Sequence, residues 1–246
     1  MQHFLARVPI VGRLARVIAV GVAHHVTQRG NGRRFLLESD ADRRVYLDLL
    51  RENLALHEVL LVGYCLMSNH VHLIVIPANP EGLALSMKHT HGRYASYWNV
   101  VHNSSGHAWQ GRYYSCPLDG PHLWEALRYT ELNPVRAKLV PEAHAWAWSS
   151  AAAHCDTVQI DAFLSTELWR NHWTRASWRE YLAAGETETE LASIRQCTHT
   201  GRPLGTREFV HSLEESMDRR LVPQKGGRPA KPRPDTRQSD LDFGLK

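Results

Sequence analysis

Two histidines separated by one valine, His70 and His72, are the first residues in this sequence that suggest chemistry. They begin a run over 70–76 that is rich in valine, leucine and isoleucine and predicts a β-strand, in which every second side chain points to the same face. Two neutral imidazoles on one face can bind a single divalent metal ion. The spacing alone carries little weight, because the chain has 16 histidines and a second such pair at His89 and His91. That second pair falls in a predicted helix, where residues two apart do not share a face. The alternative is that His70 and His72 are ordinary exposed or core-edge histidines.

A tyrosine and an asparagine four residues apart form the second candidate. Tyr129 and Asn133 share one face of a predicted helix over 121–133, if that helix reaches Asn133. Pro134 disfavours helical backbone at the residue before it, which makes the last turn uncertain. A phenol with a pKa of about 10 is a poor nucleophile at neutral pH unless its surroundings activate it. Tyr129 could instead simply pack beneath a sheet.

The elements that must position these residues follow an α+β order. Valine-rich alternation predicts strands, helical spacing of leucines predicts helices, and Ser39 suits a helix N-cap. Ser68-Asn69 suits a two-residue hairpin turn before His70. The predicted order is a strand over 15–28, a helix over 40–57, strands over 59–67 and 70–76, a helix over 82–101, a strand over 109–118 and a helix over 121–133. This pattern predicts a ferredoxin-like antiparallel sheet with helices on one face.

The remaining third of the chain has a different character. Helical patterns over 177–184, 188–196 and 206–221 predict a helical C-terminal extension. Residues 222–246 are rich in proline, glycine and cations, a composition that cannot form a core and predicts a disordered basic tail. We therefore divide the chain into a domain over 1–155, an extension over 156–221 and a tail over 222–246.

Composition excludes several classes of protein. The formal net charge is +4 with 29 lysines and arginines, and seven of these cations lie between Arg219 and Arg237 with a single aspartate. A nucleic-acid partner is therefore permitted but not required. The four cysteines form no Cys-x-x-Cys pair, which argues against a cysteine zinc site and a secreted disulfide scaffold. No apolar run reaches the ~18–20 residues that span a bilayer, so we expect a cytoplasmic protein without a membrane partner.

Taken together, the motifs resemble those of REP-associated tyrosine transposases, which belong to the single-tyrosine transposases of the HUH nuclease superfamily. The two central motifs are His70-Val71-His72 and the segment from Tyr129 to Ala137. Further matching segments are His24 to Asn31, Trp109 to Tyr113, Trp148-Ser149-Ser150, Gly201 to Gly205 and the basic residues between Lys225 and Lys231. The resemblance spans most of the chain.

The resemblance implies an enzyme and assigns roles to residues. It implies that Tyr129 is the catalytic nucleophile and that His70, His72 and Asn133 bind a divalent metal, Mn²⁺ or Mg²⁺, with imidazole favouring Mn²⁺. The implied activity is cleavage and rejoining of single-stranded DNA through a 5′-phosphotyrosine, at the foot of hairpins formed by palindromic repeats. The implied setting is the bacterial nucleoid, with the protein acting as a monomer or a homodimer.

Cations and aromatic residues near these motifs are candidate DNA contacts. Arginines can pair with phosphates and aromatic rings can stack on unpaired bases. The candidates are Arg29, Arg33, Arg34, Trp109, Arg112, Tyr113, Lys225, Arg228 and Lys231. Each arginine could equally be a solvated surface residue, and the aromatic rings could belong to the sheet core.

Two other functions remain open at this stage. A ferredoxin-like sheet with exposed aromatic residues also suits a non-catalytic regulator that binds hairpin DNA or RNA. A purely structural metal on the histidines is a further alternative, and it predicts that chelation unfolds the protein.

Overall fold

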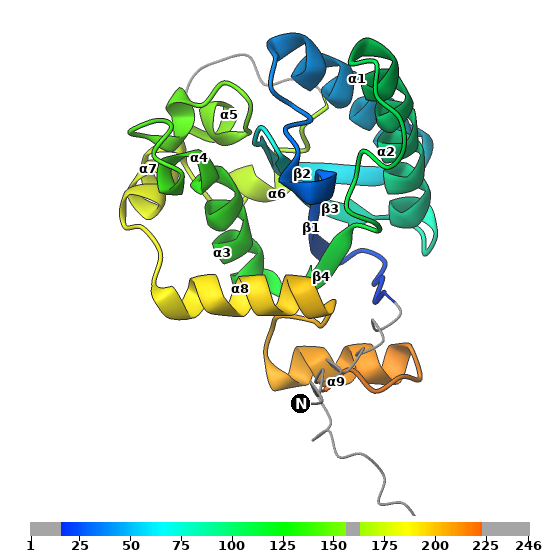
Figure 1. Ribbon diagram of the computed structural model, residues 1–246. Helices are drawn as coiled ribbons and strands as arrows, with labels where there is room; N and C mark the ends of the chain where they lie inside the picture. The colour runs from blue at the N-terminus through cyan, green and yellow to red at the C-terminus, as the bar shows by residue number, and fades with distance from the viewer. Residues whose placement is uncertain (1–15, 156–162, 223–246) are drawn as a thin grey trace, which may run out of the picture.

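A four-stranded antiparallel sheet forms the centre of the computed structural model, which describes residues 16–155 and 163–222. The strand order is β2-β3-β1-β4, and helices α1 and α2 follow β1 and β3 along the chain (Figure 1). The bounds are β1 Ala23–Arg29, α1 Asp40–Leu56, β2 Val59–Leu66, β3 His70–Pro77, α2 Gly82–Val101 and β4 Tyr114–Leu118. This is the ferredoxin-like arrangement, so the α+β fold predicted from the sequence is confirmed.

Helices α1 and α2 pack against each other and cover one face of the sheet. The sheet face that they cover is apolar, because alternate residues of β3 point toward the two helices and are fully buried. These residues are Val71, Leu73 and Val75. Helix α1 begins where the sequence predicted, because Ser39 accepts a hydrogen bond from the Asp42 amide and the Asp42 carboxylate accepts one from the Ser39 amide.

The opposite face of the sheet is covered by α3 (Gly120–Glu131). The prediction of helices on one face therefore describes α1 and α2 but not α3. The physical reason is that the central strands are apolar on both sides, since Ala23, Ile74 and Cys116 form a second core under α3. A sheet with two apolar faces must be covered on both. Gly63 of β2 allows the close approach, because a Cβ atom there would collide with the Leu127 side chain of α3.

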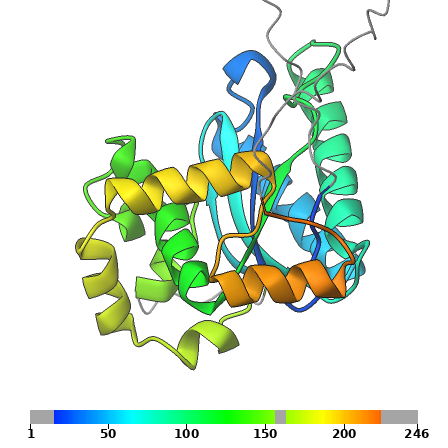
Figure 2. The same cartoon turned by 90° about the horizontal axis from the view of Figure 1, so that it is seen from below.

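Short helices and the C-terminal extension complete the α3 side of the molecule. They are α4 Asn133–Arg136, α5 Ala151–Cys155, α6 Glu167–Arg170, α7 Arg175–Ala183, α8 Glu188–Thr200 and α9 Arg207–Ser216, with 3₁₀ turns at Asn31–Arg33 and Ala143–Ala145. The helices predicted over 177–184, 188–196 and 206–221 correspond to α7, α8 and α9 with shifted ends. Helix α8 runs across α3 and β4, as the view from below shows (Figure 2).

The extension shares the core of the sheet. Trp178, Leu182 and Leu191 of α7 and α8 lie in the same buried cluster as Ile74 and Leu127. The domain boundary between residues 155 and 156 stays a prediction, and residues 223–246 of the predicted tail lie outside the described part of the chain. Among the described residues, no helix is both long enough and apolar enough to cross a membrane.

A buried carboxylate ties α3 to its neighbours. Glu131 is fully buried, and its Oε1 accepts hydrogen bonds from Ser150 Oγ and His154 Nδ1, both at 2.6 Å. Its Oε2 accepts one from Trp178 Nε1 at 2.9 Å. Ser150 also accepts a hydrogen bond from the Tyr64 amide of β2. The network therefore connects α3, α5, α7 and the sheet, and it includes Ser150, the last residue of the Trp-Ser-Ser segment.

Candidate active site

The sheet brings three imidazoles to one face. In the β1–β3 register Thr27 lies opposite His72 and Arg29 opposite His70, so His25 projects to the same side as these residues. His70 and His72 have ring centroids 5.0 Å apart, as their shared face predicted. The side chains open into a pocket of about 670 Å³ on the α3 side of the sheet.

Helix α3 adds Tyr129 to this pocket. The Tyr129 ring stands edge-on to the rings of His72 and His25, with centroids 5.5 Å and 5.6 Å away. Asn133 also lines the pocket, at the start of α4. The chain therefore brings together His70, His72, Tyr129 and Asn133, which the sequence analysis had connected only through resemblance.

The end of α3 explains how Asn133 is oriented. Pro134 has no N–H, so it cannot donate to the Thr130 carbonyl as a continuing helix would. The Asn133 side chain compensates, because its Nδ2 donates to the carbonyls of Tyr129 and Thr130 at 3.3 Å and 3.4 Å. The amide nitrogen is thus used by the helix end, and Oδ1 is the atom that Asn133 can offer to a metal.

The electrostatics keep the three histidines neutral. Burial, together with the positive charge of Arg136, lowers the pKa of His25 to about 3. Burial, together with the charges of Arg29 and Arg136, lowers the pKa of His70 to about 4. Burial also lowers the pKa of His72 well below its usual value, assisted by the neighbouring imidazoles. A neutral imidazole has a lone pair for a metal ion at neutral pH, whereas an imidazolium does not.

His70, His72 and Asn133 suit a divalent ion as a donor set. Asn69 Oδ1 lies 2.6 Å from His70 Nδ1 and can only accept, so the proton of His70 is on Nδ1 and the lone pair is on Nε2. Ligating histidines are commonly oriented in this way by an acceptor on their other nitrogen. Among the described residues no three His, Cys, Asp or Glu side chains are grouped to hold a metal. Asn133 lines the same pocket as His70 and His72 and has an amide oxygen of the kind that binds divalent ions.

Buried neutral histidines make acid sensitivity an expected property of this protein. The pKa values of His24, His25, His70 and His91 are lowered from 6.5 to about 4, 3, 4 and 3. Between these values and 6.5 the unfolded chain binds protons that the folded chain does not. The free energy of unfolding should therefore fall as the pH drops below 6.5, by up to about 1.4 kcal/mol per pH unit for each histidine. Urea unfolding of metal-free protein at about pH 7 and about pH 5 measures this difference, and equal midpoints and slopes would contradict it.

Arg136 is a functional candidate that sequence reasoning did not select. Its guanidinium lies 4.2 Å from the centre of the Tyr129 ring, and Nη2 donates to the Tyr129 carbonyl at 2.6 Å. The other side of the guanidinium pairs with Glu186, which follows α7. Arg136 therefore places a fixed positive charge beside the tyrosine ring.

Other residues that sequence reasoning missed come from β1 and α8. His25 belongs to a matching motif, and its alternation with the buried Val26 is the signal that would have placed it on the His72 face. No local signal marks the α8 residues that line the pocket, because the chain returns to the site more than 60 residues after Tyr129. They are Arg195, Thr198 and His199.

The predicted arginine contacts differ in their distance from this pocket. Arg29 lines the pocket itself. Arg33 and Arg34 are exposed on the turn after β1, where the Arg34 guanidinium donates to Ser104 and lies over Trp98. Arg112 is exposed beside Tyr114 and His199, in a small neighbouring hollow. Lys225, Arg228 and Lys231 lie outside the described residues.

The two predicted stacking residues, Trp109 and Tyr113, belong to the core instead. Trp109 is 7% exposed, and its Nε1 donates to the His91 carbonyl within the α1/α2 core. Tyr113 is also 7% exposed and packs in the same core. Neither ring is free to stack on a base, so this part of the prediction is corrected. Besides Tyr129, the pocket is lined by Tyr114, which is half-buried and stacks on His199 with ring centroids 5.1 Å apart.

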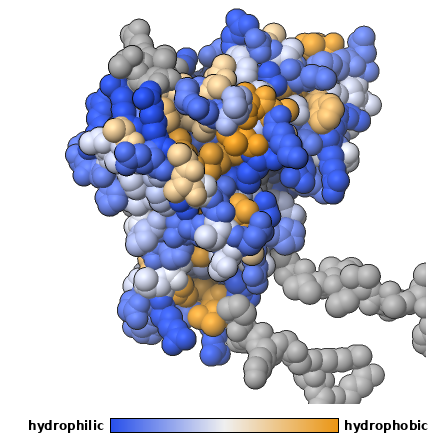
Figure 3. All heavy atoms as spheres, turned by 90° about the vertical axis from the view of Figure 1, so that its left-hand side faces the viewer, coloured by the Kyte–Doolittle hydropathy of each residue, from blue (hydrophilic) through white to orange (hydrophobic). Residues whose placement is uncertain are grey.

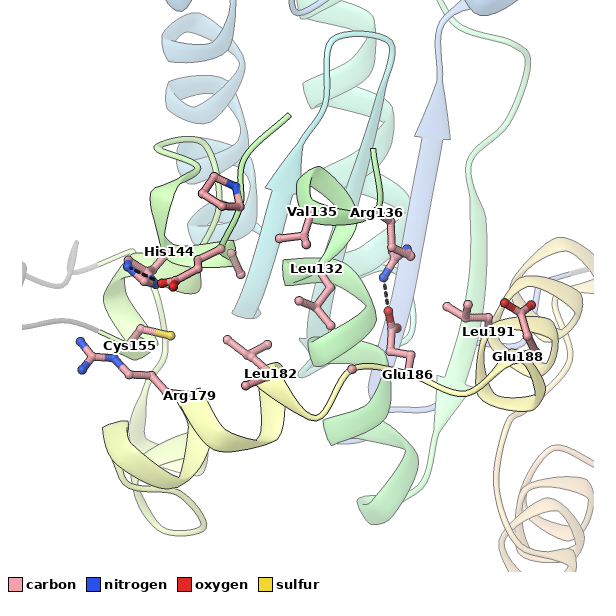
Figure 4. A pocket seen from close by; sticks show the side chains of 15 residues that line it. Leu132, Val135, Arg136, His144, Cys155, Arg179, Leu182, Glu186, Glu188 and Leu191 are labelled. Atoms are coloured by element: carbon pink, nitrogen blue, oxygen red, sulfur yellow. Dashed lines mark hydrogen bonds and ion pairs between the residues drawn. The ribbon is translucent and has the colours of Figure 1, made fainter. Parts of the chain in front are cut away.

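A second hollow, of about 750 Å³, shares Arg136 with the first and is lined by apolar residues that include Leu132, Val135 and Leu182 (Figure 4). Glu186 and Arg136, which also line this hollow, form an ion pair with each other. The space-filling view of the molecule from the side of α3 to α7 shows apolar patches among hydrophilic side chains (Figure 3).

Comparison with known proteins finds a matching family model over part of the chain. Residues 19–133, which span the sheet, His70, His72, Tyr129 and Asn133, match the family described as "Transposase IS200 like". This segment is therefore similar to the IS200-like transposases. The transposase resemblance drawn from the sequence motifs is therefore confirmed.

Two solved structures of transposases are also similar, at low sequence identity. One is a REP-associated tyrosine transposase bound to a REP hairpin, which is 13% identical over 64% of this chain and 93% of that chain, with a TM-score of 0.49. The other, from Deinococcus radiodurans R1, is described as a candidate transposase and is 17% identical over 52% of this chain and 92% of that chain, with a TM-score of 0.34. No curated protein matches this sequence.

Proposed function

We propose that this IS200-like transposase is a metal-dependent endonuclease and strand transferase that acts on single-stranded or hairpin DNA, with Tyr129 as its nucleophile. The observation that carries the proposal is the shared pocket, in which Tyr129 stands beside His72 while His70 and Asn133 line the same wall. A pure DNA-binding regulator has no need of a tyrosine held between imidazoles and an arginine. The REP-associated branch of the family is proposed on the motif resemblance.

The proposed step is a phosphoryl transfer that conserves the phosphodiester. Tyr129 Oη attacks the phosphorus and loses its proton, and the bond from phosphorus to the 3′-oxygen breaks. The 3′-oxygen leaves with a proton as the 3′-hydroxyl of the upstream strand, and the downstream strand stays on the protein through its 5′-phosphate, as a 5′-phosphotyrosine. A 3′-hydroxyl of another strand can then attack this phosphotyrosine in the reverse sense, so rejoining requires no ATP.

The residues around Tyr129 supply positioning and charge for this step. A Mn²⁺ or Mg²⁺ ion held by His70, His72 and Asn133 Oδ1 would act as a Lewis acid on the scissile phosphate. Arg136 beside the Tyr129 ring and Arg29 at the rim provide fixed positive charge for the phosphate oxygens. The Tyr114–His199 stack offers an aromatic surface to an unpaired base next to the cleaved bond.

The proposed substrate is the single-stranded foot of a hairpin formed by a palindromic repeat. A phosphate must enter the pocket with its flanking bases splayed apart, which a paired duplex does not allow without unpairing. The proposed place of action is the bacterial nucleoid. Arg33, Arg34 and Arg112 are exposed outside the pocket and are proposed to contact phosphates of the flanking DNA.

The basic tail is proposed to hold the hairpin stem through its phosphates. Truncation after Leu221 removes Lys225, Arg228 and Lys231 together with the rest of the tail. We expect weaker hairpin binding and a shallower dependence of affinity on salt, by about one unit of slope for each phosphate that the tail no longer neutralises. Titrations of labelled hairpin at several salt concentrations measure both quantities. Identical affinity and slope in the truncated protein would refute the role of the tail.

A covalent adduct tests the proposed function. The full-length protein is incubated with a labelled hairpin carrying single-stranded flanks, with and without Mn²⁺, and the products are separated on a denaturing gel. We expect a labelled protein band only with Mn²⁺, and a DNA-derived mass on the peptide that contains Tyr129. Hairpin binding without any adduct would favour the non-catalytic regulator, and loss of the folded protein on chelation would favour a structural metal.

A further inference from the structure

A buried row of three side chains connects α8 to the proposed metal site. Thr198 Oγ1 lies 2.7 Å from His25 Nδ1, and His25 Nε2 lies 2.8 Å from His72 Nδ1. The three residues are 3%, 1% and 5% exposed, so water does not compete for these hydrogen bonds. The rings of His25 and His72 are parallel within 7°. Thr198 is 126 positions from His72, so only the folded extension can complete this row.

The hydrogen bonds along this row of three side chains can run in one of two directions, which differ in the nitrogen of each histidine that carries the proton. In the first, His72 Nδ1–H donates to His25 Nε2 and His25 Nδ1–H donates to Thr198 Oγ1, which leaves the lone pair of His72 on Nε2. In the second, Thr198 donates to His25 and His25 donates to His72, which leaves a proton on His72 Nε2. Only the first direction allows His72 to bind a metal through Nε2, the nitrogen that His25 does not occupy.

We propose that Thr198 and His25 are positioning residues that set the tautomer of His72, so that the C-terminal extension completes the metal site. The inference rests on the proposed function. A threonine within a helix can donate its hydroxyl proton to a carbonyl of the preceding turn, which leaves the oxygen free to accept from His25. Partners of this kind on ligating histidines typically change metal affinity by about 10–100-fold when they are removed.

Two ion pairs keep the extension in place for this task. Arg128 of α3 pairs with Glu190 of α8 at 2.8 Å, and Arg136 of α4 pairs with Glu186 just before α8. Both pairs connect the segment that carries Tyr129 to the segment that carries Thr198. The position of Thr198 relative to His25 is therefore coupled to that of the nucleophile.

The wild-type protein provides the first test, without any substitution. Nitrogen-15 NMR of the imidazoles in metal-free protein distinguishes a protonated nitrogen from one with a lone pair. We expect His72 and His25 each to carry their proton on Nδ1. A His72 that carries its proton on Nε2 would overturn the proposal.

Two matched pairs of variants provide the second test. His25→Phe keeps an aromatic ring but removes the acceptor for His72, and His25→Gln supplies an amide oxygen in its place. Thr198→Val removes the acceptor for His25, and Thr198→Ser restores it. Mn²⁺ binding is followed by electron paramagnetic resonance of the free ion, and the tautomer of His72 is recorded in the same samples.

The expected pattern separates a positioning role from mere packing. His25→Phe should weaken Mn²⁺ binding about 10–100-fold and move the His72 proton to Nε2, and Thr198→Val should weaken binding about 10-fold. The glutamine and serine variants should remain within about 3-fold of the wild type. If all four variants bind Mn²⁺ with the affinity of the wild type, the proposed positioning role of His25 and Thr198 is wrong. A missing adduct in a protein with the expected tautomer and Mn²⁺ affinity would instead count against the proposed function alone.

Discussion

Tyr129→Phe is expected to abolish the covalent adduct with hairpin DNA and to leave the fold intact. The substitution removes only the hydroxyl oxygen, which forms the bond to phosphorus in the proposed step. We expect adduct formation to fall by at least about 1,000-fold, because loss of a nucleophile removes the covalent route itself. Within the described residues the ring packs against His72, His25 and Arg136, and phenylalanine retains all of these contacts.

The matched control for this prediction is Tyr97→Phe. Tyr97 lies on α2, at the opposite face of the sheet, and donates to Asp42 at 3.3 Å. We expect this variant to form the adduct at the wild-type rate. An adduct of wild-type yield in Tyr129→Phe would show that another residue is the nucleophile, whatever the metal dependence. Hairpin binding by Tyr129→Phe, measured by fluorescence anisotropy, separates a failure of the reaction from a failure to bind the substrate.

Glu131→Ala is expected to produce the largest loss of stability of any single substitution considered for this fold. The carboxylate is fully buried and accepts from Ser150, His154 and Trp178. Alanine leaves His154 Nδ1 and Trp178 Nε1 without an acceptor in the core, and Ser150 Oγ keeps only the Tyr64 carbonyl at 3.4 Å. We expect the free energy of unfolding to fall by about 3–5 kcal/mol, because each buried donor left without an acceptor costs about 1–3 kcal/mol.

Urea unfolding followed by circular dichroism measures this loss, with Glu180→Ala as the control. Glu180 is exposed on α7, so its removal should change the free energy of unfolding by less than about 0.5 kcal/mol. Glu131→Gln should fall between the two, since an amide keeps the shape but can accept at one oxygen only. A Glu131→Ala protein as stable as the control would mean that the network contributes nothing to the position of α3.

Local patterns in the sequence were sufficient to predict that the four strands exist and that His70 and His72 share one face. The strand predicted over 70–76 placed His70 and His72 on one face, because side chains two residues apart on a strand point to the same side. Capping and helical spacing predicted α1 from Ser39 onward and α2 over 82–101, because both signals act within a few residues. The family motif then associated Tyr129 and Asn133 with the histidines before their contact was known.

The position at which β4 begins explains why the predicted stacking residues were wrong. The predicted strand over 109–118 begins only at Tyr114, because the chain turns at Gly111, whose φ of +80° does not fit a strand. Tyr114 is the partner of Thr27 and therefore faces the pocket. Trp109 and Tyr113 lie before the strand and fill the opposite core.

The sequence by itself determined the βαββαβ order, the shared face of His70 and His72, and the candidate nucleophile, because each of these depends on neighbours along the chain. Only the tertiary structure decided what surrounds them. Arg136 meets the Tyr129 ring because Pro134 ends α3 and begins a new turn. Thr198 reaches His25 because α8 folds back over the sheet. Burial that lowers the pKa of His72 and contacts between distant segments arise only when the whole chain is packed, so no local pattern records them.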